Sequence, residues 1–151
     1  MDRAGNSPAN GPARIVVGVD GSPSSRAALG WALRQARLVG GTLDAVITWD
    51  YPALYGWEAP MQDAGFSEYA GKVLADCVHE ALGDDIPVEI REMVELGNAA
   101  QVLLETSRTA DLLVLGSRGL GGFAGATLGS VSQHCVQHAT CPVVIVRDQE
   151  R

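Results

Sequence analysis

Hydrophobic and polar positions divide the chain into strand-like and helix-like segments. Residues 15–19, 112–115 and 143–146 are continuous apolar runs, which are typical of strands buried on both faces of a sheet. A further strand is predicted near residues 43–49. Residues 88–94 alternate with polar side chains, so we expect this strand at or near a sheet edge.

Amphipathic segments fill the connections between these strands. The predicted helices cover residues 23–39, 70–81, 99–106 and 130–139. Ser22 is placed to cap the first helix, with Pro23 at its first position and Gly40 at its end. Asn98 is placed to cap the third helix. Strict alternation of strands and helices predicts an α/β fold with a single doubly wound five-stranded parallel sheet.

Length and composition indicate one globular domain. The chain has 151 residues, of which 46% are hydrophobic and 19% are charged. Residues 1–13 are small and polar, so we predict a disordered N-terminal tail, a domain over residues 14–147 and a short C-terminal tail over residues 148–151. A net charge of -7 disfavours nucleic acid and anionic membranes as partners.

Cysteine usage and the apolar pattern point to the cytoplasm. Cys77, Cys135 and Cys141 are odd in number and irregularly spaced, which argues against a disulfide framework and for a reducing compartment. The first residues do not resemble a signal peptide, and no apolar run approaches the length of a membrane span. We therefore expect a cytoplasmic protein.

A glycine-rich stretch between a buried strand and a helix carries the candidate chemistry. Gly116, Gly119 and Gly129 precede Ser130, which lies at the predicted helix start. Glycine lets the backbone approach a ligand closely, and the unpaired N–H groups of a first helical turn attract anions. This arrangement predicts a phosphate-binding loop.

The loop must bind phosphate without a Walker lysine. Lys72 is the single lysine of the chain, and no Gly-Lys-Ser or Gly-Lys-Thr occurs. Backbone N–H groups would therefore do most of the binding, the Ser130 hydroxyl can add a donor, and Arg118 either contacts phosphate or points to solvent.

The spacing of these residues resembles the universal stress protein family, in its ATP-binding branch. That branch has Gly-x2-Gly-x9-Gly followed by Ser or Thr, and every position matches. The blocks at residues 17–22, 110–117 and 141–146 extend the resemblance over residues 14–147. It implies the strand order 3-2-1-4-5 of an adenine-nucleotide alpha hydrolase-like fold. One departure is the sequence Gly97-Asn98-Ala99, where relatives often have Gly-x-Pro; it lies away from the phosphate motif.

The resemblance also implies how ATP, with or without Mg²⁺, is held. Asp20 would lie near the ribose and phosphates, and Thr48 would offer backbone groups to adenine. The glycine loop and the first residues of the last helix would bind the phosphates. The candidate nucleotide-binding residues are Asp20, Thr48, Gly116, Arg118, Gly119, Gly129, Ser130 and Val131.

Other residues have a structural interpretation beside a functional one. Asp20 either caps the turn after the first strand or binds ligand, and its place at a strand's carboxyl end favours the ligand. His134 and His138 are four residues apart and Cys141 follows, but no fourth ligand is evident, so we assign no metal site. Cys77 is expected to pack in the core.

The long aromatic connection over residues 51–67 stays open. Its aromatic side chains either form a lid over adenine or pack on helices or a partner subunit. These side chains are Tyr51, Tyr55, Trp57 and Phe66.

The resemblance implies a nucleotide-dependent regulator or sensor of the stress response that acts as a homodimer. The last strand would be an unpaired apolar edge, and related proteins pair two such strands across a two-fold axis. The strand comprises Val143, Val144, Ile145 and Val146. Two alternatives remain: a slow ATPase or a cyclic-AMP- or AMP-binding protein on the same fold, and an interaction module with structural glycines. No catalytic residue is assigned, because no base and nucleophile pair is evident beside the loop.

Overall fold

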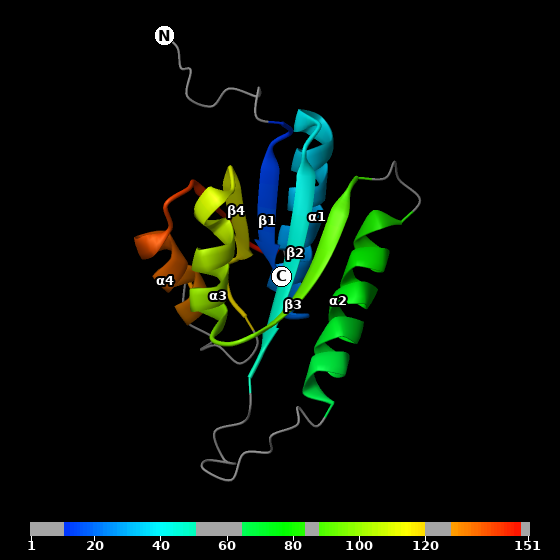
Figure 1. The fold of residues 1–151 in the computed structure, drawn as a ribbon, viewed down its shortest axis with the longest axis vertical. Coiled ribbons are helices and arrows are strands. Elements are labelled where there is room, and N and C mark those ends of the chain that lie inside the picture. Colours follow the sequence, from blue (N-terminus) through cyan, green and yellow to red (C-terminus); the bar gives the residue numbers. More distant parts are fainter. Residues whose placement is uncertain (1–10, 51–64, 84–87, 120–127, 149–151) are drawn as a thin grey trace.

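The computed structural model describes residues 11–50, 65–83, 88–119 and 128–148. Strands and helices alternate within these ranges (Figure 1). The elements are β1 Arg14–Gly18, α1 Pro23–Val39, β2 Thr42–Trp49, α2 Phe66–Leu82, β3 Ile90–Leu96, α3 Ala99–Thr106, the 3-10 turn η4 Ser107–Thr109, β4 Leu112–Gly116, α4 Ser130–His138 and β5 Val143–Val146. Most of the predicted N-terminal tail, the end of the C-terminal tail and the aromatic residues Tyr51, Tyr55 and Trp57 lie outside the described residues.

The strands form one parallel sheet in the order β3-β2-β1-β4-β5, which confirms the expected topology. Helices α1 and α2 pack together against one face, and α3 and α4 pack together against the other (Figure 1). The chain winds outward from β1 to β3 and then returns to β4 on the other side of β1. The strand order therefore reverses between β1 and β4, where doubly wound sheets bind ligands.

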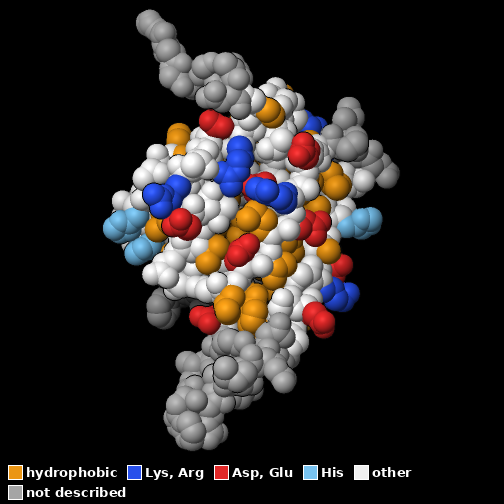
Figure 2. All heavy atoms as spheres, in the orientation of Figure 1, with side chains coloured by type: hydrophobic (Ala, Val, Ile, Leu, Met, Phe, Trp, Pro, Cys, Tyr) orange, Lys and Arg blue, Asp and Glu red, His pale blue; other side chains and the backbone are white. Residues whose placement is uncertain are grey.

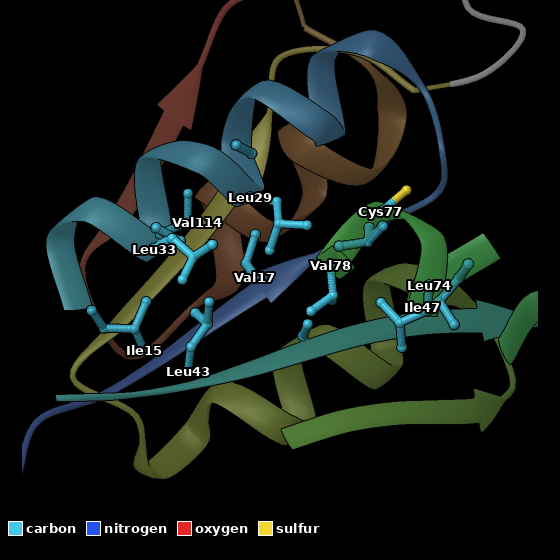
Figure 3. Close-up of a cluster of buried hydrophobic side chains, with 14 of the residues drawn as sticks. Ile15, Val17, Leu29, Leu33, Leu43, Ile47, Leu74, Cys77, Val78 and Val114 are labelled. Atoms are coloured by element: carbon cyan, nitrogen blue, oxygen red, sulfur yellow. The ribbon is translucent and has the colours of Figure 1, made fainter. Parts of the chain in front are cut away.

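Alternate residues of the central strands fill two separate cores. Ile15 and Val17 of β1 join the core beneath α1 and α2, whereas Val16 joins the core beneath α3 and α4. Figure 3 shows Leu29 and Leu33 of α1 facing Ile15 and Val17 of β1. Burial on both faces explains why the strand reads as a continuous apolar run.

Capping residues set the helix boundaries as predicted. The Ser22 hydroxyl accepts a hydrogen bond from the Ser25 N–H at 3.2 Å, and α1 ends at Gly40 with a left-handed φ of 67°. The Asn98 side chain accepts from the Gln101 N–H at 3.0 Å at the start of α3. No helix of the described ranges is long and apolar enough to cross a membrane.

Two predicted boundaries were wrong near the aromatic connection and the sheet edge. Helix α2 begins at Phe66, inside the segment predicted as a connection, and the Phe66 ring lies 6.4 Å from that of Trp49. Strand β3 is displaced from the predicted residues 88–94 because it pairs with β2 as far as Leu96 beside Trp49. Its position at the end of the sheet was predicted correctly.

Asp44 of β2 is a buried carboxylate with two arginine partners. Its Oδ2 accepts from Arg14 Nε at 2.9 Å and from an Arg91 guanidinium nitrogen at 3.0 Å, and the residue is only 4% exposed. Arg14 also donates to the Thr106 carbonyl at 3.0 Å, which ties β1 and β2 to the end of α3. Figure 2 shows acidic and basic side chains interleaved over this face of the molecule.

Removing the charge of Asp44 should destabilise the fold. Asp44→Asn is expected to lower the free energy of unfolding by about 2 kcal/mol, because the half-buried Arg14 guanidinium loses its counter-charge. Arg108→Ala is the control, since Arg108 and Glu105 form an exposed i,i+3 pair whose loss should change the free energy by less than about 0.5 kcal/mol. Urea unfolding of both variants measures the difference, and equal effects would contradict this assignment.

Candidate functional site

A cleft of about 550 Å³ opens at the carboxyl ends of the strands, where the strand order reverses. Its walls come from the ends of β1, β2 and β4 and from the first turns of α3 and α4. This volume lies in the range of small-molecule pockets. All the candidate nucleotide-binding residues line it: Asp20, Thr48, Gly116, Arg118, Gly119, Gly129, Ser130 and Val131.

One part of the cleft is apolar. Val46 of β2, Leu103 of α3 and Leu115 of β4 contribute buried side chains to its lining. Ala99 at the start of α3 and the half-buried Thr48 extend this wall. The surface suits a flat, weakly polar group such as a nucleobase.

Another part of the lining is formed by the start of α4 and the residues that follow β4. Gly129 is the N-cap residue of α4 and, as a glycine, contributes no side-chain cap. The first-turn N–H groups of α4, including those of Ser130 and Val131, can therefore serve an anion in the cleft. Among the described lining residues, Arg118 is the one cationic side chain and Asp20 the one anionic side chain.

Gly116 and Gly119 of the motif each have a different close neighbour. A Cβ on Gly116 would lie 2.5 Å from Ser24 Oγ and 2.6 Å from the Ser24 carbonyl carbon, so the first turn of α1 packs directly on β4. A Cβ on Gly119 would lie 2.7 Å from Asp20 Oδ2. Backbone atoms of α1 therefore exclude a side chain at Gly116, whereas at Gly119 the close atom belongs to a carboxylate that can move, so the approach of phosphate stays the predicted reason for glycine there.

The two ends of the glycine loop are joined at a neck formed by Ser117 and Gly129. The Gly129 N–H donates to the Ser117 carbonyl at 2.7 Å, and a Cβ on Gly129 would lie 3.3 Å from the Arg118 Cα. The Ser117 N–H donates to the Val146 carbonyl of β5 at 2.9 Å. Residues 120–127, which belong to the loop between Ser117 and Gly129, lie outside the described residues.

Asp20 caps the turn after β1, as its structural interpretation proposed. Its Oδ1 accepts from the Ser22 N–H at 2.9 Å, and its own N–H donates to Ser25 Oγ at 3.1 Å. The carboxylate also lines the cleft and faces Gly119. The cap does not exclude a ligand role, which stays a prediction.

Sequence reasoning missed a set of buried serines around the site. Ser25 and Ser132 line the cleft, and the Ser24 hydroxyl accepts from the Arg118 N–H at 3.3 Å. The Ser132 hydroxyl donates to the Gly116 carbonyl at 2.7 Å. Serine is common on solvent-facing positions, so composition gave no signal; only the tertiary contacts single these residues out.

The histidines and cysteines show no metal-binding arrangement within the described ranges. The rings of His134 and His138 lie 4.5 Å apart on the exposed side of α4, and no group of three potential ligands gathers among the described residues. Cys77 packs in the core beneath α1 and α2, as predicted. Burial raises the pKa of the Cys135 thiol to about 11 and also raises the pKa values of Cys77 and Cys141, so these thiols are weakly nucleophilic at neutral pH.

Comparison with known proteins identifies the family. The family model of the universal stress protein family matches residues 12–147. A universal stress protein of Mycolicibacterium smegmatis is 34% identical over 151 residues, which cover 91% of this chain and 49% of that protein. A universal stress protein of Mycobacterium tuberculosis is 38% identical over 148 residues, which cover 93% of this chain and 46% of that protein. The chain spans about half the length of these curated relatives.

Solved structures agree with this assignment. A universal stress protein in complex with cAMP has 28% identity and a TM-score of 0.65, covering 91% of this chain and 98% of that one. Two further structures share the fold. A universal stress protein family protein of Arabidopsis thaliana with AMP bound has 21% identity and a TM-score of 0.58, covering 91% of this chain and 93% of that one. A universal stress protein of Archaeoglobus fulgidus in complex with dAMP has 18% identity and a TM-score of 0.55, covering 89% of this chain and 97% of that one. On the family match, the sequence identities and the fold together, this chain belongs to the universal stress protein family.

Proposed function

We propose that the cleft binds an adenine nucleotide, with ATP, alone or with Mg²⁺, as the favoured ligand. The observation that carries the proposal is the convergence of all the sequence-predicted residues on one cleft at the reversal of strand order. The cAMP, AMP and dAMP complexes of the similar proteins support the adenine nucleotide class.

The base and the phosphates of the proposed ligand would occupy different parts of the cleft. Adenine would occupy the apolar wall, with Thr48 offering backbone groups. Asp20 would lie beside the ribose. The phosphates would meet the glycine loop and the first turn of α4, with Arg118 adding one positive charge. Mg²⁺ would offset the remaining phosphate charge near Asp20.

Mass spectrometry of the ligand released from purified protein tests this proposal. We expect an adenine nucleotide in a substantial fraction of the molecules, and its mass distinguishes ATP from AMP and cyclic AMP. If none is retained, calorimetric titration of the purified protein with each of the three nucleotides decides. Absence of binding to all three would leave the interaction module as the better interpretation.

We further propose that the protein acts as a cytoplasmic nucleotide-dependent regulator or sensor in the stress response. The assignment of the chain to the universal stress protein family supports this proposal. The three free thiols are consistent with a reducing compartment. Slow ATP hydrolysis is the alternative, and multiple-turnover kinetics separates it from binding alone.

The proposed homodimer pairs the outer edges of two β5 strands. In the described part of the chain β5 pairs with β4 alone, and its four side chains are half-buried. Ile145 contacts the core beneath α4, whereas Val144 contacts the core beneath α1. Such an apolar edge is an aggregation hazard unless it is covered.

Sedimentation equilibrium at micromolar concentration tests the dimer. The wild type should sediment as a dimer, and Ile145→Lys should weaken association by at least about tenfold if the α4 face forms the contact, because it buries an ammonium group there. Val144→Lys tests the α1 face in the same way. A wild-type monomer would refute the dimer.

A further inference from the structure

The end of β4 and the start of α4 are joined by one short side-chain contact. The Ser132 hydroxyl donates to the carbonyl of Gly116, the last residue of β4, at an O···O distance of 2.7 Å. Ser132 is 5% exposed, and Gly116 is also buried. The contact therefore supplies a partner to a buried backbone acceptor that water does not reach freely.

This contact lies in the lining of the cleft, next to the proposed phosphate site. Ser132 is the third residue of α4, one turn from the N-cap residue Gly129. Gly116 begins the loop whose neck is closed by the bond between the Gly129 N–H and the Ser117 carbonyl. Two bonds of 2.7 Å, the one that closes the neck and the one from Ser132, thus hold the helix start against the strand end.

We propose that Ser132 is a positioning residue for phosphate: it fixes the angle at which the α4 N–H groups face the cleft. The inference rests on the proposed function, because it concerns how that same site holds its ligand. Preorganised donors bind an anion without the loss of freedom that a mobile loop would suffer. The apolar wall, built by β2, α3 and β4, does not depend on the Ser132 hydroxyl, so adenosine binding should be insensitive to it.

The test compares ATP with adenosine in Ser132→Ala. ATP affinity, measured by calorimetry, should fall about tenfold, because the α4 N–H groups would then have to be ordered on binding. Adenosine affinity, measured by an NMR titration, should change less than about twofold. Ser132→Thr retains the hydroxyl and should restore ATP affinity to within about threefold of the wild type.

Ser107→Ala is the matched control for loss of a buried serine hydroxyl. Ser107 is 1% exposed, donates to the Leu104 carbonyl at 3.4 Å and lies outside the cleft lining. It should leave the ratio of ATP to adenosine affinity unchanged, whatever it does to thermal stability.

The outcomes separate this inference from the proposed function. Unchanged ATP affinity in folded Ser132→Ala overturns the inference, as does an equal loss of ATP and adenosine affinity, which would indicate a general structural role. Failure of Ser132→Thr to restore binding also overturns it. If the wild type binds neither ATP nor adenosine, the proposed function falls and the inference falls with it.

Discussion

Gly116→Ala is expected to lower the free energy of unfolding by about 3 kcal/mol and the melting temperature by roughly 6–12 °C. The added Cβ would lie 2.5 Å, 2.6 Å and 2.7 Å from the Oγ, carbonyl carbon and carbonyl oxygen of Ser24. Two of these atoms belong to the backbone of the first turn of α1, so rotation of a side chain cannot relieve the overlap. Helix α1 would have to move away from β4 and disturb the core that contains Leu29 and Val114.

Gly30→Ala is the control for a glycine-to-alanine change in the same region. Gly30 lies inside α1, and its Cβ would meet only the end of the Arg34 side chain at 3.7 Å, an ordinary contact. Alanine should therefore stabilise the protein by about 0.5–1 kcal/mol through helix propensity. Thermal unfolding followed by circular dichroism measures both variants, and a Gly116→Ala protein as stable as the wild type would contradict the packing described here.

Gly119→Val is expected to reduce ATP affinity by at least about 100-fold while the fold persists. Gly119 is exposed, and its Cβ would lie 2.7 Å from the Oδ2 atom of Asp20, the end of a side chain that can move. The fold can therefore accommodate valine, but only by displacing the Asp20 carboxylate or the loop, and both line the cleft. Gly129→Val should act in the same direction, because its Cβ would press on Arg118 at the neck.

A double-mutant cycle with Asp20→Ala shows whether the loss comes from this contact. If valine acts by displacing Asp20, the double variant should bind ATP more tightly than the sum of the single effects predicts, with a coupling energy above about 0.5 kcal/mol. Calorimetry on folded variants supplies the affinities. Unchanged ATP affinity in Gly119→Val would remove the loop from the binding site.

The fold was predictable because local signals agree with the tertiary arrangement. The apolar run of β1 is buried on both faces, and the caps at Ser22 and Asn98 mark true helix starts. The strand order was not worked out from the pattern itself; it came from the family resemblance. The start of α2 was missed because Phe66 is held by a tertiary neighbour, Trp49, rather than by a side-chain cap.

The site was predictable in its residues and less so in their contacts. Spacing singled out Gly116 and Gly119, but their neighbours Ser24 and Asp20 lie more than 90 residues earlier in the chain. The packing of α1 on β4 brings Ser24 to Gly116, and the pairing of β1 with β4 brings Asp20 to Gly119. The role of Ser132 could not be predicted for the same reason. Its partner, the Gly116 carbonyl, is a backbone group of β4 that leaves no pattern in the sequence.

Mapping backbone amide shifts on titration with ATP tests most directly whether an adenine nucleotide occupies the cleft at the reversal of strand order. We expect the largest ¹H–¹⁵N shift changes at Asp20, Gly119, Gly129, Ser130 and Val131, which line the cleft, while α2, on the opposite face of the sheet from α3 and α4, changes little. The same amides should respond less in Gly119→Val. Absence of shifts at these residues at millimolar ATP, or shifts concentrated on another surface, would contradict binding in this cleft.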